Sequence, residues 1–274
     1  MKKAIQRLLS FLGIKIVRIG QDNSEKPVIN VSTGALLDHD TIDDTYFTVA
    51  ATGKEVFGSN GFADDIPMLT IHQAVKYVLR NEINGDIVEC GVGNGGKMFM
   101  AAWLCQHSGE KEREMYLYDT FAGMTEPGER DYKIKKGRKL SSQRAMKEFY
   151  NASKTDSGST WCCTPLRDVK DNMAKTGYMQ SLCHYVEGDV LKTIPSIRPT
   201  NIAVLRLDTD FYDSTMHELS HLYDLVVPGG VIIFDDYGSW NGQKTAVDEF
   251  FYGIGIQPLL VRTCWKERVY VKMQ

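Results

Sequence analysis

Hydrophobic positions after residue 65 follow two alternating patterns. Segments with apolar residues at helical spacing are separated by short apolar runs of strand length. The predicted helices are "IPMLTIHQAVKYVLRNEING", "KMFMAAWLCQHSG", "TPLRDVKDNMAKTGY", "STMHELSHLYDLV" and "QKTAVDEFFYGIG". The predicted strands between them are "DIVECG", "EMYLYDTF", "CHYVEGDV", "NIAVLRLDTD" and "GGVIIFDD". Strands that alternate with helices in this way predict an α/β fold with a doubly wound, mostly parallel sheet covered on both faces.

Two further segments complete the predicted domain. The runs "PLLVRT" and "ERVYVKM" at the C-terminus predict an antiparallel strand pair. Residues from about 124 to 160 form an insertion that is much longer than the usual connection of about 4–6 residues. A long insertion near a strand end is typical of a lid or a substrate-selecting element. We therefore expect a lid over residues 124–160.

The first 65 residues differ in pattern from the rest of the chain. Residues 1–19 predict an amphipathic helix whose apolar face consists of Ile5, Leu8, Leu9, Leu12 and Ile16. Packing of this helix on its own domain or on a second subunit is favoured, and contact with a membrane surface is the alternative. Residues 20–60 are polar and predict a linker or flap. The predicted division is 1–65 for this extension and 66–274 for the main domain.

Composition excludes some classes of function. The chain of 274 residues has a formal net charge of -3, which argues against a nucleic-acid-binding protein that relies on positive charge. Its six cysteines show no CxxC spacing, so we expect neither a zinc site nor disulfides. These features favour reduced thiols and a cytoplasmic protein.

Strand ends are the places to search for a site, because ligands of doubly wound sheets bind at the carboxyl ends of the strands. After the first strand, Gly91, Gly93 and Gly96 match GxGxxG, and Glu89 precedes them. The second strand ends at Asp119 and the third is followed by Asp189. Each acid alone could cap a strand, but three at successive strand ends indicate a site for a nucleoside-containing ligand. A dinucleotide and a methyl donor both fit this pattern.

Four carboxylates follow the last two parallel strands. "RLDTDFYDST" supplies Asp208 and Asp210, and "IIFDDYG" supplies Asp235 and Asp236. If these strands are neighbours, like charges would converge and require a cation. Oxygen ligands without His or Cys favour Mg²⁺. The alternative, that such aspartates cap the following helix, is more plausible for Asp213 than for Asp235.

Five motifs in order link the chain to a known family: "GDIVECGVGNGG", "YDTFAGM", "GYMQSLCHYVEGDVLKTIP", "LRLDTDFYDST" and "VPGGVIIFDDYGSWNGQKTAVDEFF". From about Leu69 to the C-terminus the sequence resembles the macrocin O-methyltransferase family, which methylates sugar hydroxyls in natural-product pathways. The resemblance implies a class I methyltransferase fold, S-adenosylmethionine as methyl donor, a metal site of three aspartates and a helical lid. It also implies the metal ligands Asp208, Asp235 and Asp236, with Asp210 as general base. The donor-binding residues that it implies are Thr70, Glu89, Gly91, Gly93, Asp119, Thr120, Asp189 and Asp208.

The predicted function is a Mg²⁺-dependent O-methyltransferase that acts on a sugar hydroxyl. An NAD-dependent oxidoreductase would use the glycine loop but leave the later aspartates without a role, and a non-catalytic S-adenosylmethionine-binding protein is the third alternative. The chain departs from the family at Gly93-Asn94 and Lys97, which could alter how the loop covers the donor. Thr209 replaces a common glycine and could reshape the acceptor pocket.

The acceptor is the least defined part of the prediction. A basic run in the lid consists of Lys133, Lys135, Lys136, Arg138 and Lys139. Such runs are usually solvated, and the alternative is that this one binds an anionic saccharide acceptor. Tyr237 and Trp240 could pack on a sugar ring or in the core. The resemblance also suggests a homo-oligomer.

Overall fold

The computed structural model describes residues 44–58, 66–135, 138–139, 147, 149–152, 154–155, 158–194 and 196–273. The chain divides into two compact units, Met1–Phe47 and Thr48–Gln274, and the following account concerns the second. The amphipathic helix predicted for residues 1–19 lies outside the described residues, and the division predicted at residue 65 stays a prediction.

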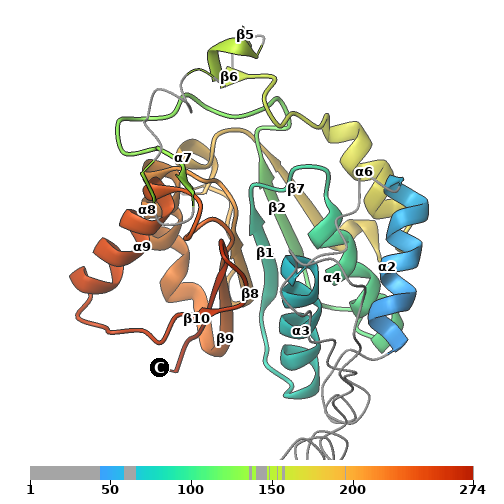
Figure 1. Ribbon diagram of the computed structural model, residues 1–274. Coiled ribbons are helices and arrows are strands. Elements are labelled where there is room, and N and C mark those ends of the chain that lie inside the picture. The colour runs from blue at the N-terminus through green and yellow to red at the C-terminus, as the bar shows by residue number, and fades with distance from the viewer. Residues whose placement is uncertain are drawn as a thin grey trace, which may run out of the picture. The chain divides into compact units, whose positions relative to one another are not determined.

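A seven-stranded sheet forms the centre of this unit, in the order β10-β11-β9-β8-β1-β2-β7 (Figure 1). The strands β9, β8, β1, β2 and β7 are parallel, whereas β11 pairs antiparallel with β9 and with β10. The prediction of a mostly parallel sheet with an antiparallel C-terminal pair is thus confirmed. The strand bounds are β1 Asp86–Cys90, β2 Met115–Asp119, β7 Cys183–Glu187, β8 Ile202–Leu207, β9 Val226–Phe234, β10 Val261–Arg262 and β11 Arg268–Val271.

Helices cover both faces of the sheet (Figure 1). One layer contains α3 and α4 with α6 beside them, and the other contains α8 and α9 with α7. The helix bounds are α3 Ile66–Arg80, α4 Gly96–Ser108, α6 Leu166–Ala174, α7 Val190–Thr193, α8 Tyr212–Leu222 and α9 Asn241–Gly253, with short 3₁₀ turns at Gln180–Leu182 and Tyr223–Leu225. Because both faces are covered, central strands such as β8 are buried along their length, and β8 is apolar except for Arg206.

The register of the parallel strands brings the predicted site residues to one edge. Cys90 at the end of β1 pairs with Leu207 at the end of β8, and Leu207 pairs with Phe234 at the end of β9. The residues that follow, including Asp208 and Asp235, therefore leave the sheet at the same level.

One expectation about the linker was wrong. Residues 44–57 lie in the stretch predicted to be a linker or flap, but they form helix α2 (Asp44–Phe57). Its buried positions include Val49, Ala50 and Gly53, and the ring of Phe57, four residues after Gly53, meets Phe99 edge-on at 5.3 Å. Gly53 within this face and the threonines around it disguised the apolar pattern.

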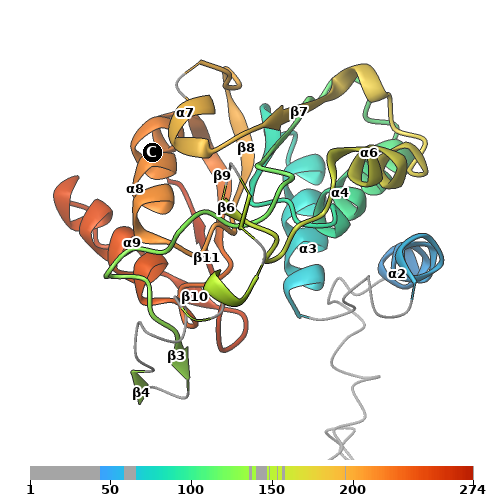
Figure 2. The same cartoon turned by 90° about the horizontal axis from the view of Figure 1, so that it is seen from above.

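The predicted lid contains short strands. The described residues of 124–160 include two antiparallel pairs, β3 (Ile134–Lys135) with β4 (Arg138–Lys139) and β5 (Lys154–Thr155) with β6 (Gly158–Ser159). Figure 2 shows β3 and β4 projecting from the body of the domain. The segment is fixed to the loop after β9, because Ile134 donates a backbone hydrogen bond to Ser239 at 2.6 Å. In the part of the chain that is described, no helix has the length and apolarity needed to cross a membrane.

Candidate active site

A cavity of about 310 Å³ opens at the carboxyl ends of β1, β2 and β8. It is lined by Gly91, Gly93, Asp119, Thr120 and Asp189 from the predicted donor site, by Asp208, which was predicted for both the donor and the metal, and by Asp210, the predicted general base. Four predicted residues do not line it, namely Thr70, Glu89, Asp235 and Asp236. The cavity therefore joins the glycine loop to part of the aspartate cluster.

The glycine loop is shaped by backbone conformations that favour glycine. Gly91 has a φ of 82°, and a Cβ added there would lie 2.2 Å from the carbonyl oxygen of Asp208. Gly93 has a φ of 54°, and a Cβ there would meet nothing within 4 Å. Gly91 is thus required by close packing against β8, whereas Gly93 leaves open space at the cavity wall.

Asp119 holds this loop in place. Its Oδ2 accepts hydrogen bonds from the backbone N–H groups of Val92 at 2.8 Å and Gly93 at 3.0 Å, and its Oδ1 accepts one from Phe121 at 2.8 Å. Burial raises the pKa of Asp119, and these backbone hydrogen bonds oppose the rise. The carboxylate thus anchors the loop and also lines the cavity.

Asp189 has a local role as well. Its Oδ1 accepts a hydrogen bond from Leu191 N–H at 3.0 Å, so the residue caps the four-residue helix α7. The sequence left strand capping open for this residue; the structure shows a helix cap instead, together with a position in the cavity wall.

Thr70 and Glu89 are buried and do not line the cavity. The hydroxyl of Thr70 donates to Glu267 at 2.6 Å. Glu89 is 1% exposed and pairs with Arg206, and among the described residues its Oε2 has no hydrogen-bond partner. Burial raises the pKa of Glu89 to about 7, although the charge of Arg206 opposes this. Their predicted contact with the donor stays a prediction.

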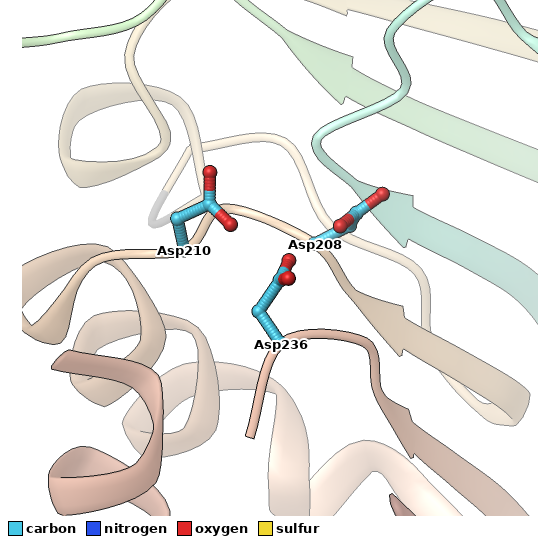
Figure 3. Close-up of side chains that lie close together, drawn as sticks. All are labelled: Asp208, Asp210 and Asp236. Carbon is cyan, nitrogen blue, oxygen red and sulfur yellow. The ribbon is translucent and has the colours of Figure 1, made fainter. Parts of the chain in front are cut away.

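Three carboxylates form a cluster at the other end of the cavity. Carboxylate oxygens of Asp208, Asp210 and Asp236 all lie within 4.8 Å of one another, and Figure 3 shows the three side chains converging. Asp210 adopts the left-handed backbone conformation with a φ of 63°. Burial and the neighbouring charges of Asp208 and Asp235 raise the pKa of Asp210 to about 7. Crowding of like charges in this way is relieved by a cation.

Asp235 lies beside this cluster, but it is paired with two cations. Its Oδ1 accepts a hydrogen bond from Nη2 of Arg206 at 2.6 Å, and its Oδ2 pairs with Nζ of Lys266. Burial alone would raise the pKa of Asp235, but these two cations outweigh it and hold the pKa well below its usual range. The sequence had grouped Asp235 with Asp208 and Asp236, whereas the geometry groups Asp210 with them. A metal-ligand role for Asp235 stays a prediction.

Arg206 was missed in the sequence, although it lies at the centre of the site. It is 2% exposed near the C-terminal end of β8 and pairs with Glu89, with Asp208 at 2.7 Å and with Asp235. A buried guanidinium needs such partners. The signal was present in "AVLRLD", where one charge interrupts an apolar strand. Lys266 gave no such signal, because it comes from a polar turn before β11.

The two aromatic candidates differ in position. The hydroxyl of Tyr237 donates to Asp248 at 2.6 Å, and its ring faces the cations of Lys244 and Arg268. Trp240 is 4% exposed and meets Phe211 edge-on at 5.4 Å, and Phe211 lines the cavity. Trp240 therefore backs the cavity wall.

The basic run is described only in part. The side chains of residues 135–139 lie outside the description, but the ammonium of Lys133 lies 5.3 Å from the ring centre of Trp161 and 5.1 Å from that of Trp240. Lys133 thus lies against the indoles that support Phe211.

Comparison with known proteins gives a family. The sequence profile of the Macrocin-O-methyltransferase (TylF) family matches residues 64–270. The chain is 30% identical over 187 residues to 8-demethyl-8-(2,3-dimethoxy-alpha-L-rhamnosyl)-tetracenomycin-C 4'-O-methyltransferase of Streptomyces olivaceus, covering 68% of this chain and 65% of that protein. It is 29% identical over 180 residues to demethyldecarbamoylnovobiocin O-methyltransferase of Streptomyces niveus, covering 66% and 63%. The match thus spans slightly less than two thirds of these relatives' own length.

Solved structures with a similar fold are methyltransferases. The O-methyltransferase NovP superposes with a TM-score of 0.70 at 22% identity, covering 84% of this chain and 100% of NovP. The calicheamicin methyltransferase CalS11 gives a TM-score of 0.56 at 16% identity, covering 84% and 93%. At these identities the likeness concerns the fold, and it confirms the predicted class I methyltransferase architecture.

Proposed function

The chain belongs to the Macrocin-O-methyltransferase (TylF) family, and from this premise we propose that it transfers a methyl group from S-adenosylmethionine to a hydroxyl of a sugar or glycosylated natural product. The observation that carries the proposal is the single cavity that joins a glycine loop to clustered carboxylates. The names of the two relatives, which include a rhamnosyl 4'-O-methyltransferase, support the acceptor class. Neither is an oxidoreductase, so the dinucleotide alternative has no support from them.

The residues at the glycine loop fit the methyl donor. A cavity of about 310 Å³ is within the range of small-molecule sites. The space beside Gly93 and the position of α4 directly after the loop leave room for a ligand at the strand edge. The residues that would hold the donor are Gly91, Gly93, Asp119, Thr120 and Asp189. When bound, S-adenosylmethionine supplies an electrophilic methyl group on its sulfonium.

The carboxylate cluster fits Mg²⁺, because oxygen ligands alone suit a hard divalent ion, which is often held by one or two carboxylates plus substrate oxygens. Asp208 and Asp236 would hold the ion, because both the sequence prediction and the observed carboxylate cluster include them. When bound, Mg²⁺ supplies a Lewis acid that lowers the pKa of an acceptor hydroxyl. Asp235, in this proposal, anchors Arg206 and Lys266.

Asp210 is the group that we propose takes the proton of the acceptor hydroxyl. Its carboxylate lines the cavity beside Asp208, and a pKa near 7 suits a base that works close to neutral pH. Phe211 and Met124 also line the cavity, and their apolar side chains would limit the access of water to the reacting groups. The cavity holds donor and acceptor together, and this positioning supplies much of the acceleration.

The basic run bears on whether the acceptor is anionic. The described member of the basic run nearest the site is Lys133, which lies over Trp161 and Trp240. If the acceptor is anionic, its KM should rise with ionic strength, because screening weakens attraction to exposed charges. A KM that does not change with salt would remove the anionic class of acceptor.

The direct test is calorimetric titration with S-adenosylhomocysteine, in Mg²⁺ and again in EDTA. Binding in both solutions is expected, because Gly91, Gly93, Asp119, Thr120 and Asp189 are not among the carboxylates that would hold the metal, and Asp208 alone was predicted for both. Binding only in Mg²⁺ would tie the aspartates to the donor and contradict this division. Absence of binding in both would contradict the methyltransferase proposal itself.

A further inference from the structure

Gln243 lies in the first turn of α9 and is completely buried. Its Oε1 accepts a hydrogen bond from the backbone N–H of Asp236 at 2.7 Å, and its Nε2 donates to the carbonyl of Leu207 at 3.1 Å. Leu207 is the last residue of β8, and Asp236 is the second residue after β9. The amide thus bridges the two strand ends at the point where the chain leaves the sheet.

The backbone of Gln243 makes a third contact with the same region. Its N–H donates to the carbonyl of Asp210 at 3.0 Å. Asp210 is held in the left-handed conformation, which costs a non-glycine residue about 1–2 kcal/mol and needs support from its surroundings. Gln243 therefore contacts both segments that carry the clustered carboxylates.

The first turn of α9 has little freedom to move. A Cβ added at Gly242 would lie 2.0 Å from Oδ1 of Asp131 and 2.7 Å from the backbone nitrogen of Tyr212. Asp131 itself is 4% exposed and accepts a hydrogen bond from Tyr212 N–H at 2.8 Å. Because the helix start is packed this tightly, a shorter side chain at 243 would not be compensated by a shift of the helix.

We propose that Gln243 is a positioning residue that fixes the separation of Asp208 and Asp210 from Asp236, and thereby sets the affinity of the cluster for a divalent cation. The inference rests on the proposed function. Like charges in the cluster repel each other when no cation is bound, so the two loops tend to separate. Only a side chain that both donates and accepts, at the length of glutamine, can hold Leu207 and Asp236 together.

Two variants separate this role from a general contribution to stability. Gln243→Glu keeps the size and the acceptor for Asp236 N–H, but as a carboxylate it cannot donate to Leu207. Gln243→Met has a similar length and removes both side-chain hydrogen bonds. The backbone hydrogen bond to Asp210 is available in both. The control is Gln180→Met, because the side chain of Gln180 likewise donates to Tyr178 at 2.9 Å and accepts from Tyr185 at 3.0 Å. Gln180 is exposed and lies in the turn before β7, which is separated from β8 by β1 and β2.

The experiment measures binding of Mn²⁺, as a probe for Mg²⁺, and of S-adenosylhomocysteine to each purified full-length protein. Loss of a residue that orients metal ligands commonly weakens metal affinity by about 10- to 100-fold. We expect Mn²⁺ affinity to fall by about tenfold or more in both Gln243 variants. Donor affinity should stay within about twofold of the wild type, because the glycine loop follows β1 and is held by Asp119 at the end of β2. The control should change neither.

Each other outcome has a definite meaning. Unchanged Mn²⁺ affinity in the Gln243 variants would overturn the inference, and so would an equal loss of both affinities, which would indicate a merely structural role. If Gln243→Met does not fold, the same criteria apply to Gln243→Glu. If the wild type binds the donor product but not Mn²⁺, the metal part of the proposed function fails and this inference with it. If the wild type binds neither, the methyltransferase proposal fails.

Discussion

Replacing Asp235 by Asn tests which carboxylates belong to the cation site. As a metal ligand, Asp235 would be one of several crowded like charges in the metal-free protein, and its removal would relieve repulsion. As the structure has it, Asp235 is 2% exposed and neutralises Arg206 and Lys266. The two hypotheses therefore predict opposite signs for the change in unfolding free energy without metal.

The size of the effect follows from the partners that remain. Breaking a buried ion pair by removing one partner costs about 3–5 kcal/mol. Arg206 would keep Glu89 and Asp208, and the Lys266 side chain is 29% exposed, so solvent offsets part of the loss. We expect Asp235→Asn to destabilise the metal-free protein by about 2–3 kcal/mol.

Asp210→Asn is the matched comparison. Asp210 has no basic partner among the groups that shift its pKa, and its neighbours Asp208 and Asp235 are acidic. Asn tolerates the left-handed backbone at this position better than most residues do. Removing the charge should therefore leave the metal-free protein unchanged or stabilise it by about 1 kcal/mol.

Urea unfolding in EDTA near neutral pH measures both changes, and a repeat in Mg²⁺ measures the stabilisation that the ion adds to each protein. If Asp235→Asn were as stable as the wild type in EDTA and Mg²⁺ no longer stabilised it, the ion-pair explanation would be wrong. The ligand set predicted from the sequence would then be restored.

Three further predictions concern single residues. Gly91→Ala should weaken binding of S-adenosylhomocysteine by about tenfold or more in calorimetry, because its Cβ would lie 2.2 Å from the Asp208 carbonyl oxygen. Gly93→Ala, where the Cβ meets open space, should reduce this affinity clearly less. Burial, assisted by the charge of Arg80, lowers the pKa of His72 to about 4. The free energy of unfolding of the wild type should therefore fall by about 2 kcal/mol as the pH drops from the unfolded pKa near 6.5 towards 4. Urea unfolding of His72→Gln should not show this dependence on pH. Thr209→Val should lower the unfolding free energy by about 1–3 kcal/mol in urea unfolding, because buried Glu218 loses the hydroxyl that donates to it at 3.1 Å. An unchanged unfolding free energy would mean that Glu218 does not need this hydrogen bond.

The sequence determined the sheet and the edge at which the site lies. The apolar runs of β1, β8 and β9 are strands because both faces are covered, and each ends where its pattern changes to Gly or Asp. The rule that ligands bind at the carboxyl ends of such strands then placed Gly91, Asp119 and Asp208 at one cavity. Helix α2 was missed because Gly53 and the neighbouring threonines weaken the apolar pattern of its buried face, which includes Val49 and Ala50.

Tertiary structure decided which way each carboxylate faces. Asp235 and Asp236 are adjacent, so on an extended chain their side chains point in opposite directions, and the sequence does not say which one enters the cluster. Lys266, which is 31 positions from Asp235 in the sequence, decides this, because it reaches Asp235 only after β11 has paired with β9. Arg206 and Gln243 likewise act through contacts between strands and helices that are distant in sequence. The residue types at the strand ends are a local property of the chain, but the direction of each charge depends on partners that folding brings from elsewhere.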